Sequence, residues 1–182
     1  MNEKVNSTNE TKKRGFPWRA LAIFAFVYAA YGFNEFLMLS AGLFDSDTIG
    51  TLIIGGIAGI IAAVFVANVV VAIQYAVTKF PAQWISKEKN VYKNDIWQGL
   101  LYSGAIGIVM NFILETLNYH ENVLLRTAVN VITTVLFLLF YISGEDKESH
   151  VVKAVTIVQV VLLVLGILLS VLVGDVAVDI LL

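Results

Sequence analysis

Long apolar runs separated by short polar segments dominate the pattern of this chain. Five of these runs are long enough to cross a hydrocarbon core, which takes about 20 helical residues. They cover residues 20–43, 49–77, 96–117, 123–142 and 154–173. The pattern therefore predicts an all-α integral membrane protein with five transmembrane helices.

The polar segments between these runs are short, so the five helices are expected to form one domain. Residues 1–17 are polar and charged, and we expect a disordered basic tail because they lack the apolar content needed to fold alone. The transmembrane domain covers residues 18–174, and residues 175–182 form a short external tail. Pro81 is expected to end the second helix, which makes residues 78–95 the longest loop. Residues 143–150 read as an ordinary solvated turn.

Small residues recur every four positions on two of the predicted helices. Such a stripe presents almost no side chain, so another helix can approach its backbone closely. We expect the stripes to be packing faces, either between helices of one chain or between two copies of it. The packing stripe comprises Gly55, Gly59, Ala63 and Ala67 on the second helix and Gly99, Ser103 and Gly107 on the third.

The third and fourth helices are predicted to form an antiparallel hairpin at the centre of the bundle. Asn111 and Glu115 continue the stripe on the third helix, and Arg126 and Asn130 lie on a similar stripe of the fourth. Asparagines that face lipid would leave their amides unsatisfied, so pairing across the hairpin is favoured. For a turn near residues 120–121, the expected pairs are Glu115 with Arg126, Asn111 with Asn130 and Gly107 with Thr134.

Glu35 is an acidic residue inside the first predicted span. It follows Arg19 by sixteen residues, or about 24 Å along a helix, which puts it near the far interface of the membrane. One interpretation is that its carboxylate reaches headgroups or water. The alternative is that it joins a polar cluster able to bind a cation or a proton. The candidate cluster is Glu35, Asn111, Glu115, Arg126 and Asn130.

Composition and charge agree with a membrane protein and predict its orientation. Hydrophobic residues make up 58% of the chain and charged residues 14%, against about 25% charged in soluble domains. If the N-terminus is inside, eleven of the twelve Lys and Arg residues lie in inner segments and only Arg126 lies outside. Because inner loops carry an excess of positive charge, we predict an N-inside, C-outside protein. The expected location is a cell membrane, of the prokaryotic cytoplasmic kind.

The sequence contains no motif that indicates catalysis or a cofactor. Its lack of cysteine excludes disulfides and thiolate metal sites. Its two histidines, His120 and His150, are predicted on opposite sides of the membrane, so one chain cannot build a histidine metal site. Phosphate-binding loops, His-Glu-x-x-His, G-x-S-x-G and potassium-filter motifs are missing. We expect no catalytic residues, no cofactor and no metal, and the case for an enzyme is weak.

Three classes of function are compatible with these features. The first is a packing or accessory subunit of a larger membrane assembly. The second is a small channel or carrier for an ion or a polar solute, with the polar cluster as its outward-facing entrance. The third is an intramembrane enzyme or an immunity factor. The expected partners are the lipid bilayer and either another membrane protein or a second copy of the chain. Nucleic acid is not expected, because the four lysines of residues 78–95 lie too close to the membrane.

Overall fold

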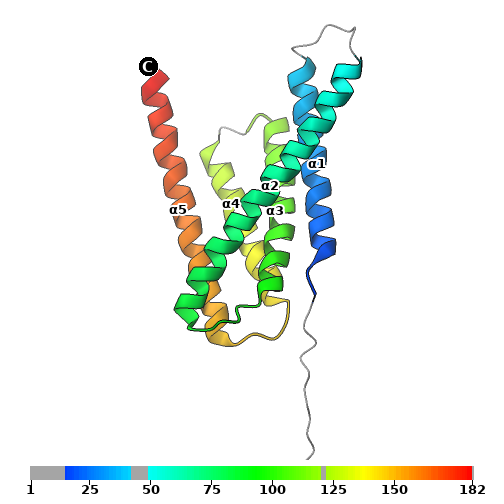
Figure 1. The fold of residues 1–182 in the computed structure, drawn as a ribbon. Coiled ribbons are helices and arrows are strands. Elements are labelled where there is room, and N and C mark those ends of the chain that lie inside the picture. Colours follow the sequence, from blue (N-terminus) through cyan, green and yellow to red (C-terminus); the bar gives the residue numbers. More distant parts are fainter. Residues whose placement is uncertain (1–14, 42–48, 120–121, 182) are drawn as a thin grey trace, which may run out of the picture.

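The computed structural model describes residues 15–41, 49–119 and 122–181, and within this part of the chain every regular element is a helix. The five helices are α1 (Trp18–Ala41), α2 (Ile49–Ser86), α3 (Lys93–Thr116), α4 (Val123–Ile142) and α5 (Ser149–Leu181) (Figure 1). Each contains a stretch that is long and apolar enough to cross a membrane. This architecture fits a small polytopic membrane protein.

Some of the sequence predictions fall outside the described residues. These are the tail up to residue 14, the end of the first span at 42–43, and the hairpin turn at 120–121. At the other end of the chain, the backbone of α5 continues as a helix through residues 174–181, where the sequence predicted the external tail.

The start of α1 and the α2–α3 and α4–α5 connections lie at one end of the bundle, which is the lower end in Figure 1. The upper end holds the last turns of α1, α3 and α5. The central helix α3 packs against α1, α2 and α4, while α5 packs against α2 and α4. Helix α2 crosses the bundle obliquely, from α1 at the upper end to α5 at the lower end. Its 38 residues exceed what a bilayer core requires, which agrees with a tilt.

Local backbone features explain why α3 ends and α4 begins where they do. Asn118 adopts a left-handed conformation with φ 58°, and its N–H donates to the Glu115 carbonyl while the Tyr119 N–H donates to the Leu114 carbonyl. These two bonds satisfy carbonyls that the last turn of a helix otherwise leaves unpaired. The Asn122 side chain then accepts hydrogen bonds from the first-turn N–H groups of α4 at 3.0 and 3.2 Å, as a helix N-cap does.

The prediction that Pro81 ends the second helix is wrong. Helix α2 passes through Pro81 and continues to Ser86, so that the connection to α3 covers only residues 87–92. A proline removes one N–H donor, and a helix tolerates this loss where tertiary packing holds the following turn. Here Ala82 is fully buried in the core, and the Gln83 side chain donates to the Lys89 carbonyl at 2.6 Å.

The buried core lies mainly in the lower half of the bundle. Its largest side chains are Phe24 of α1, Ile96 and Leu101 of α3, and Phe137 and Tyr141 of α4, each with at most 2% of its surface exposed. The Phe137 and Tyr141 rings stack at 6.1 Å between centroids. Among the residues whose burial is described, the upper halves of the helices contribute few buried ones, so this part of the bundle is less tightly packed than the lower end.

The sequence had suggested that the α4–α5 connection is an ordinary solvated turn, and this prediction is wrong. Lys147 lies within it, yet its side chain is only 2% exposed and pairs at 2.7 Å with Asp95 of α3, whose side chain is 3% exposed. The ammonium group also lies over the rings of Tyr92 and Tyr141. Asp95 is in the first turn of α3, where the helix dipole favours negative charge. The connection is therefore anchored to the core by a buried ion pair.

Candidate functional site

Four of the predicted cluster residues lie together near the upper end of the bundle. The Tyr31 hydroxyl of α1 donates a hydrogen bond of 3.4 Å to the Glu115 carboxylate of α3, and it interacts electrostatically with Glu35 one turn further along α1. Glu115, Asn111 and Arg126 line a cavity of about 300 Å³ with Tyr31. Tyr31 was not singled out from the sequence, although its four-residue spacing from Glu35 puts both on one face of α1.

Glu115 and Arg126 share this cavity without forming a direct ion pair. The structure describes the side chains of both Glu115 and Arg126, and no ion pair joins them. Their placement around a common space leaves the guanidinium and the carboxylate accessible to a small polar molecule. Glu35 is exposed and Glu115 half-buried.

Asn130 does not join the other four residues. It lines a second cavity on the opposite side of the α3–α4 pair, while Asn111 lines the first. The contact between the two helices is made instead by Gly99 with Phe137 and by Gly107 with Thr133, one position from the expected Thr134. A four-residue step turns a helix by about 400°, so a stripe at this spacing rotates by about 40° per step. Three steps from Gly99 carry Asn111 about 120° around α3, so the two residues do not lie on the same face of the helix.

The small-residue stripes lie at helix contacts within the chain. Gly55 and Gly59 of α2 face Phe36 of α1, and a Cβ placed on Gly32 of α1 would lie 2.5 Å from the Cβ of Ala63. Ala67 is buried further along α2. On α3, Gly99 and Gly107 face α4, and Ser103 is buried between them. The close approach that these residues permit therefore serves the α1–α2 and α3–α4 pairs.

The second cavity lies inside the membrane-spanning part of the bundle and is the stronger candidate for a functional site. Its volume is about 410 Å³, it is partly open, and residues of four helices line it. The polar residues that line it are Gln74 and Thr78 of α2, Ser103 of α3, Asn130, Thr133 and Thr134 of α4, and Gln159 of α5. Apolar side chains such as Phe137, Leu100 and Leu162 complete the lining. No charged side chain of the described residues contributes to it.

Hydrogen bonds within this cavity leave two amides unpaired. The Gln159 side chain donates to the Thr78 hydroxyl at 2.8 Å, which joins α5 to α2. Thr133 and Thr134 both donate to the Asn130 backbone carbonyl, at 3.0 and 2.8 Å. Asn130 and Gln74 are exposed, and the side-chain hydrogen bonds of the described residues do not include one from either amide. An unpaired amide inside a hydrocarbon layer is costly, so this space favours a polar occupant.

Sequence reasoning identified Asn130 and Ser103 but missed Gln74, Thr78 and Gln159. Thr78 had been assigned to a loop because Pro81 was expected to end the helix. A usable signal existed: Gln74 and Thr78 are four residues apart and therefore lie on one face of a continuous helix. Periodicity could not show which helix packs against this face, because residues 78 and 159 belong to helices that are far apart in the sequence.

One exposed group of side chains has the composition of a cation site. Glu88, Glu148 and His150 present ligand atoms within 4.8 Å of one another at the lower end of the bundle. His150 lies 3.6 Å from Glu88 and 3.4 Å from Glu148. All three are solvent-exposed, and the histidine–carboxylate contacts account for their arrangement without a metal. We therefore assign no metal site to them.

No family model, curated protein or solved structure matches this chain.

Proposed function

We propose that this protein binds a small, uncharged polar solute in the cavity between α2, α3, α4 and α5 and moves it across the membrane. The observation that carries this proposal is the set of seven hydroxyl and amide side chains that four apolar helices direct to one space. Amides and hydroxyls both donate and accept hydrogen bonds, so they suit a solute that does the same. The lack of charged groups among the lining residues disfavours an ion.

The second support is the difference between the two ends of the bundle. Below the cavity, Phe137 stacks on Tyr141, and the Asp95–Lys147 pair closes the lower end. Above it, the upper half of α5 stands apart from the other helices (Figure 1). A carrier exposes its site to one side at a time. The described conformation corresponds to a site that is closed toward the lower end.

We further propose that the lower end faces the inside of the cell. Eleven of the twelve Lys and Arg residues belong to segments at or beyond this end in a five-span arrangement, and Arg126 is the exception. The positive-inside rule supports this orientation. In it, the polar cluster of Glu35, Glu115 and Arg126 lies at the outer end, where it contributes to the approach of a solute.

The proposal is tested with purified full-length protein in liposomes. Stopped-flow light scattering after an osmotic challenge with glycerol or urea should show faster solute entry than in protein-free liposomes, while potassium chloride should not enter faster. Asn130→Leu should slow entry by roughly tenfold, which corresponds to the loss of about 1.4 kcal/mol, within the range of one hydrogen bond. The control Val131→Leu changes a neighbouring exposed apolar residue that does not line the cavity. Equal entry with and without protein would refute the proposal.

A packing or accessory subunit of a larger membrane assembly is the second candidate. The observation in its favour is the second half of α5, where Leu165, Leu168 and Leu169 are 49–60% exposed and the helix diverges from the rest of the bundle (Figure 1). A helix of another membrane protein, or of a second copy, would bury this surface. Purification in mild detergent with a mass measurement by light scattering tests it, since a monomer without a copurifying protein removes this candidate.

A further inference from the structure

A third cavity lies at the lower end of the bundle, separate from the proposed solute site. Its volume is about 440 Å³, and it is formed where α2 ends, the connection runs through residues 87–92, and α3 begins. Three lysines from these three segments line it: Lys79 of α2, Lys89 of the connection and Lys93 of α3. The carboxamides of Gln83 and Asn90 lie between them.

Positive charge dominates this cavity even though two acidic residues also line it. Asp95 is one of them, but its carboxylate is neutralised by Lys147 at 2.7 Å and accepts the Glu145 backbone N–H at 3.1 Å. Glu145 is the other acidic residue. The lining therefore carries three ammonium groups against one remaining carboxylate, that of Glu145. The first turn of α3 also lies at this cavity, and the dipole of the helix favours negative charge there.

The walls of the cavity are held in place by hydrogen bonds and ring contacts. The Gln83 side chain donates to the Lys89 carbonyl at 2.6 Å, and the Asn90 side chain accepts the Tyr92 N–H at 3.2 Å. The Lys79 ammonium lies 5.5 Å from the centre of the Tyr75 ring and 5.3 Å from that of Phe80. These hydrogen bonds and ring contacts therefore hold the lysine-bearing segments in place around the cavity.

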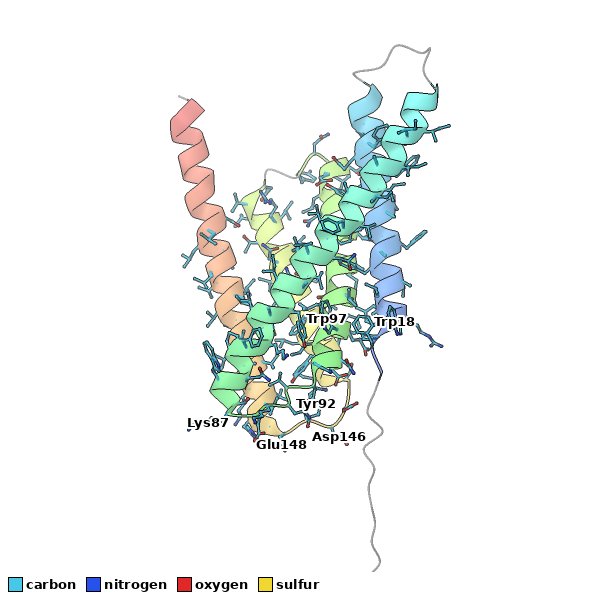
Figure 2. All side chains as sticks on the ribbon, in the orientation of Figure 1. Trp18, Lys87, Tyr92, Trp97, Asp146 and Glu148 are labelled. Carbon is cyan, nitrogen blue, oxygen red and sulfur yellow. The ribbon has the colours of Figure 1, made fainter. Side chains whose placement is uncertain are left out.

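The position of the cavity indicates the source of an anionic ligand. Phe80, Trp84 and Ile85 follow Lys79 on α2 and are 51%, 79% and 48% exposed, which is the apolar and aromatic surface typical of a helix at the membrane interface. Trp18 and Trp97 lie at the same end of the bundle, above Tyr92 (Figure 2). A lysine-lined cavity next to such a surface lies at the membrane interface, where the nearby phosphate groups are those of lipids.

We propose that the cavity lined by Lys79, Lys89 and Lys93 binds the phosphate headgroup of an anionic phospholipid, whose acyl chains lie along the exposed face of α2. Ammonium and carboxamide N–H groups donate hydrogen bonds to phosphate oxygens. This inference does not depend on the proposed solute site, because the two cavities share no lining residue.

The test uses the full-length protein in a neutral detergent, with lipid binding read by native mass spectrometry and by the shift in melting temperature. Phosphatidylglycerol should bind and raise the melting temperature, and phosphatidylcholine should do so far less. The variant Lys79→Gln/Lys89→Gln should bind phosphatidylglycerol about 20- to 30-fold more weakly, at roughly fivefold per lysine. The matched control Lys87→Gln/Lys153→Gln removes two exposed lysines that do not line the cavity and should keep wild-type affinity.

Three results would overturn the proposal. The first is an equal loss of affinity in the cavity variant and in its control. The second is equal binding of phosphatidylcholine and phosphatidylglycerol. The third is complete competition by inorganic phosphate at equal concentration, which would assign the site to free phosphate. If the double variant fails to fold, the single change Lys89→Gln at an exposed position carries the test with an expected fivefold loss.

Discussion

Single glycines determine how closely α1 and α2 approach each other. Gly32 is buried, and a Cβ at this position would meet the Ala63 Cβ at 2.5 Å and the Gly59 carbonyl oxygen at 3.4 Å. At Gly59 itself the nearest atom to an added Cβ is the Cβ of Phe36, at 3.5 Å, which is an ordinary contact. Two glycines of the same helix pair therefore differ in whether they tolerate a side chain.

We expect Gly32→Ala to destabilise the protein and Gly59→Ala to be neutral or stabilising. Alanine is about 1 kcal/mol better than glycine inside a helix, but at residue 32 the added methyl group forces the two backbones apart, at a cost of about 1–3 kcal/mol. Thermal unfolding in detergent measures both variants. Equal melting temperatures for the two would show that the close contact between Gly32 and Ala63 does not limit the approach of the helices.

The buried pair of Asp95 and Lys147 gives a second prediction at the level of residues. Replacing one partner, by Asp95→Asn or Lys147→Met, leaves a buried charge without its counter-ion and should cost about 3–5 kcal/mol. The double variant should be less destabilised than the sum of the single ones. Chemical unfolding of the four proteins in mixed micelles measures this coupling.

The exposed Lys153→Met change is the control for this pair and should have little effect. A coupling energy near zero would mean that the Asp95–Lys147 pair is not what anchors the α4–α5 connection.

At the level of elements, the length of α2 matters most. Because this helix continues past Pro81, Thr78 lies within it and accepts the hydrogen bond from Gln159 of α5. Both residues are buried. This contact holds the lower halves of α2 and α5 together and forms part of the wall of the proposed solute site.

We expect Thr78→Val to weaken the contact between α2 and α5. The change keeps the shape of the side chain but removes the acceptor for Gln159, which should cost about 0.6–2 kcal/mol. Thr156→Val is the matched control, since Thr156 donates only to the carbonyl of Val152 in its own helix. Unfolding in detergent should separate the two variants, and indistinguishable stabilities would argue against a structural role for the Thr78–Gln159 bond.

At the level of the whole molecule, the two ends of the bundle have different properties. The lower end combines the buried ion pair, most of the apolar core and the lysine-lined cavity. The upper end carries the Tyr31–Glu115 contact and the cavity around Arg126. We have proposed on this basis that the lower end is the inner end and binds anionic lipid, and that the upper end is the outer end.

Cysteine labelling in intact cells tests the orientation. In a chain without cysteine, Tyr119→Cys at the upper end should react with a membrane-impermeant reagent, while Asp146→Cys at the lower end should react only after permeabilisation. Tyr119 is preferred to Asn118, whose positive φ makes substitution unfavourable. Labelling of Asp146→Cys in sealed cells would reverse the proposed orientation.

The class of the protein and the positions of its spans could be predicted from the sequence. Apolar length is a local property, since each backbone polar group in a hydrocarbon layer must be satisfied within its own helix. The predicted fourth span coincides with α4 at Val123–Ile142. The local spacing also predicted helix contacts at Ala63, Gly99 and Gly107, where the neighbouring helix approaches closely, but it left open whether that helix belongs to the same chain.

Tertiary structure alone decided which polar residues share a space. Asn111 and Asn130 were expected to pair, but the rotation of a four-residue stripe around α3 turns them toward different cavities. The tilt of α2 brings Thr78 to Gln159, and the fold of the α4–α5 connection brings Lys147 to Asp95. These contacts depend on the relative rotation and tilt of helices, which the hydrophobic pattern does not encode because a mostly apolar helix can present any face to lipid.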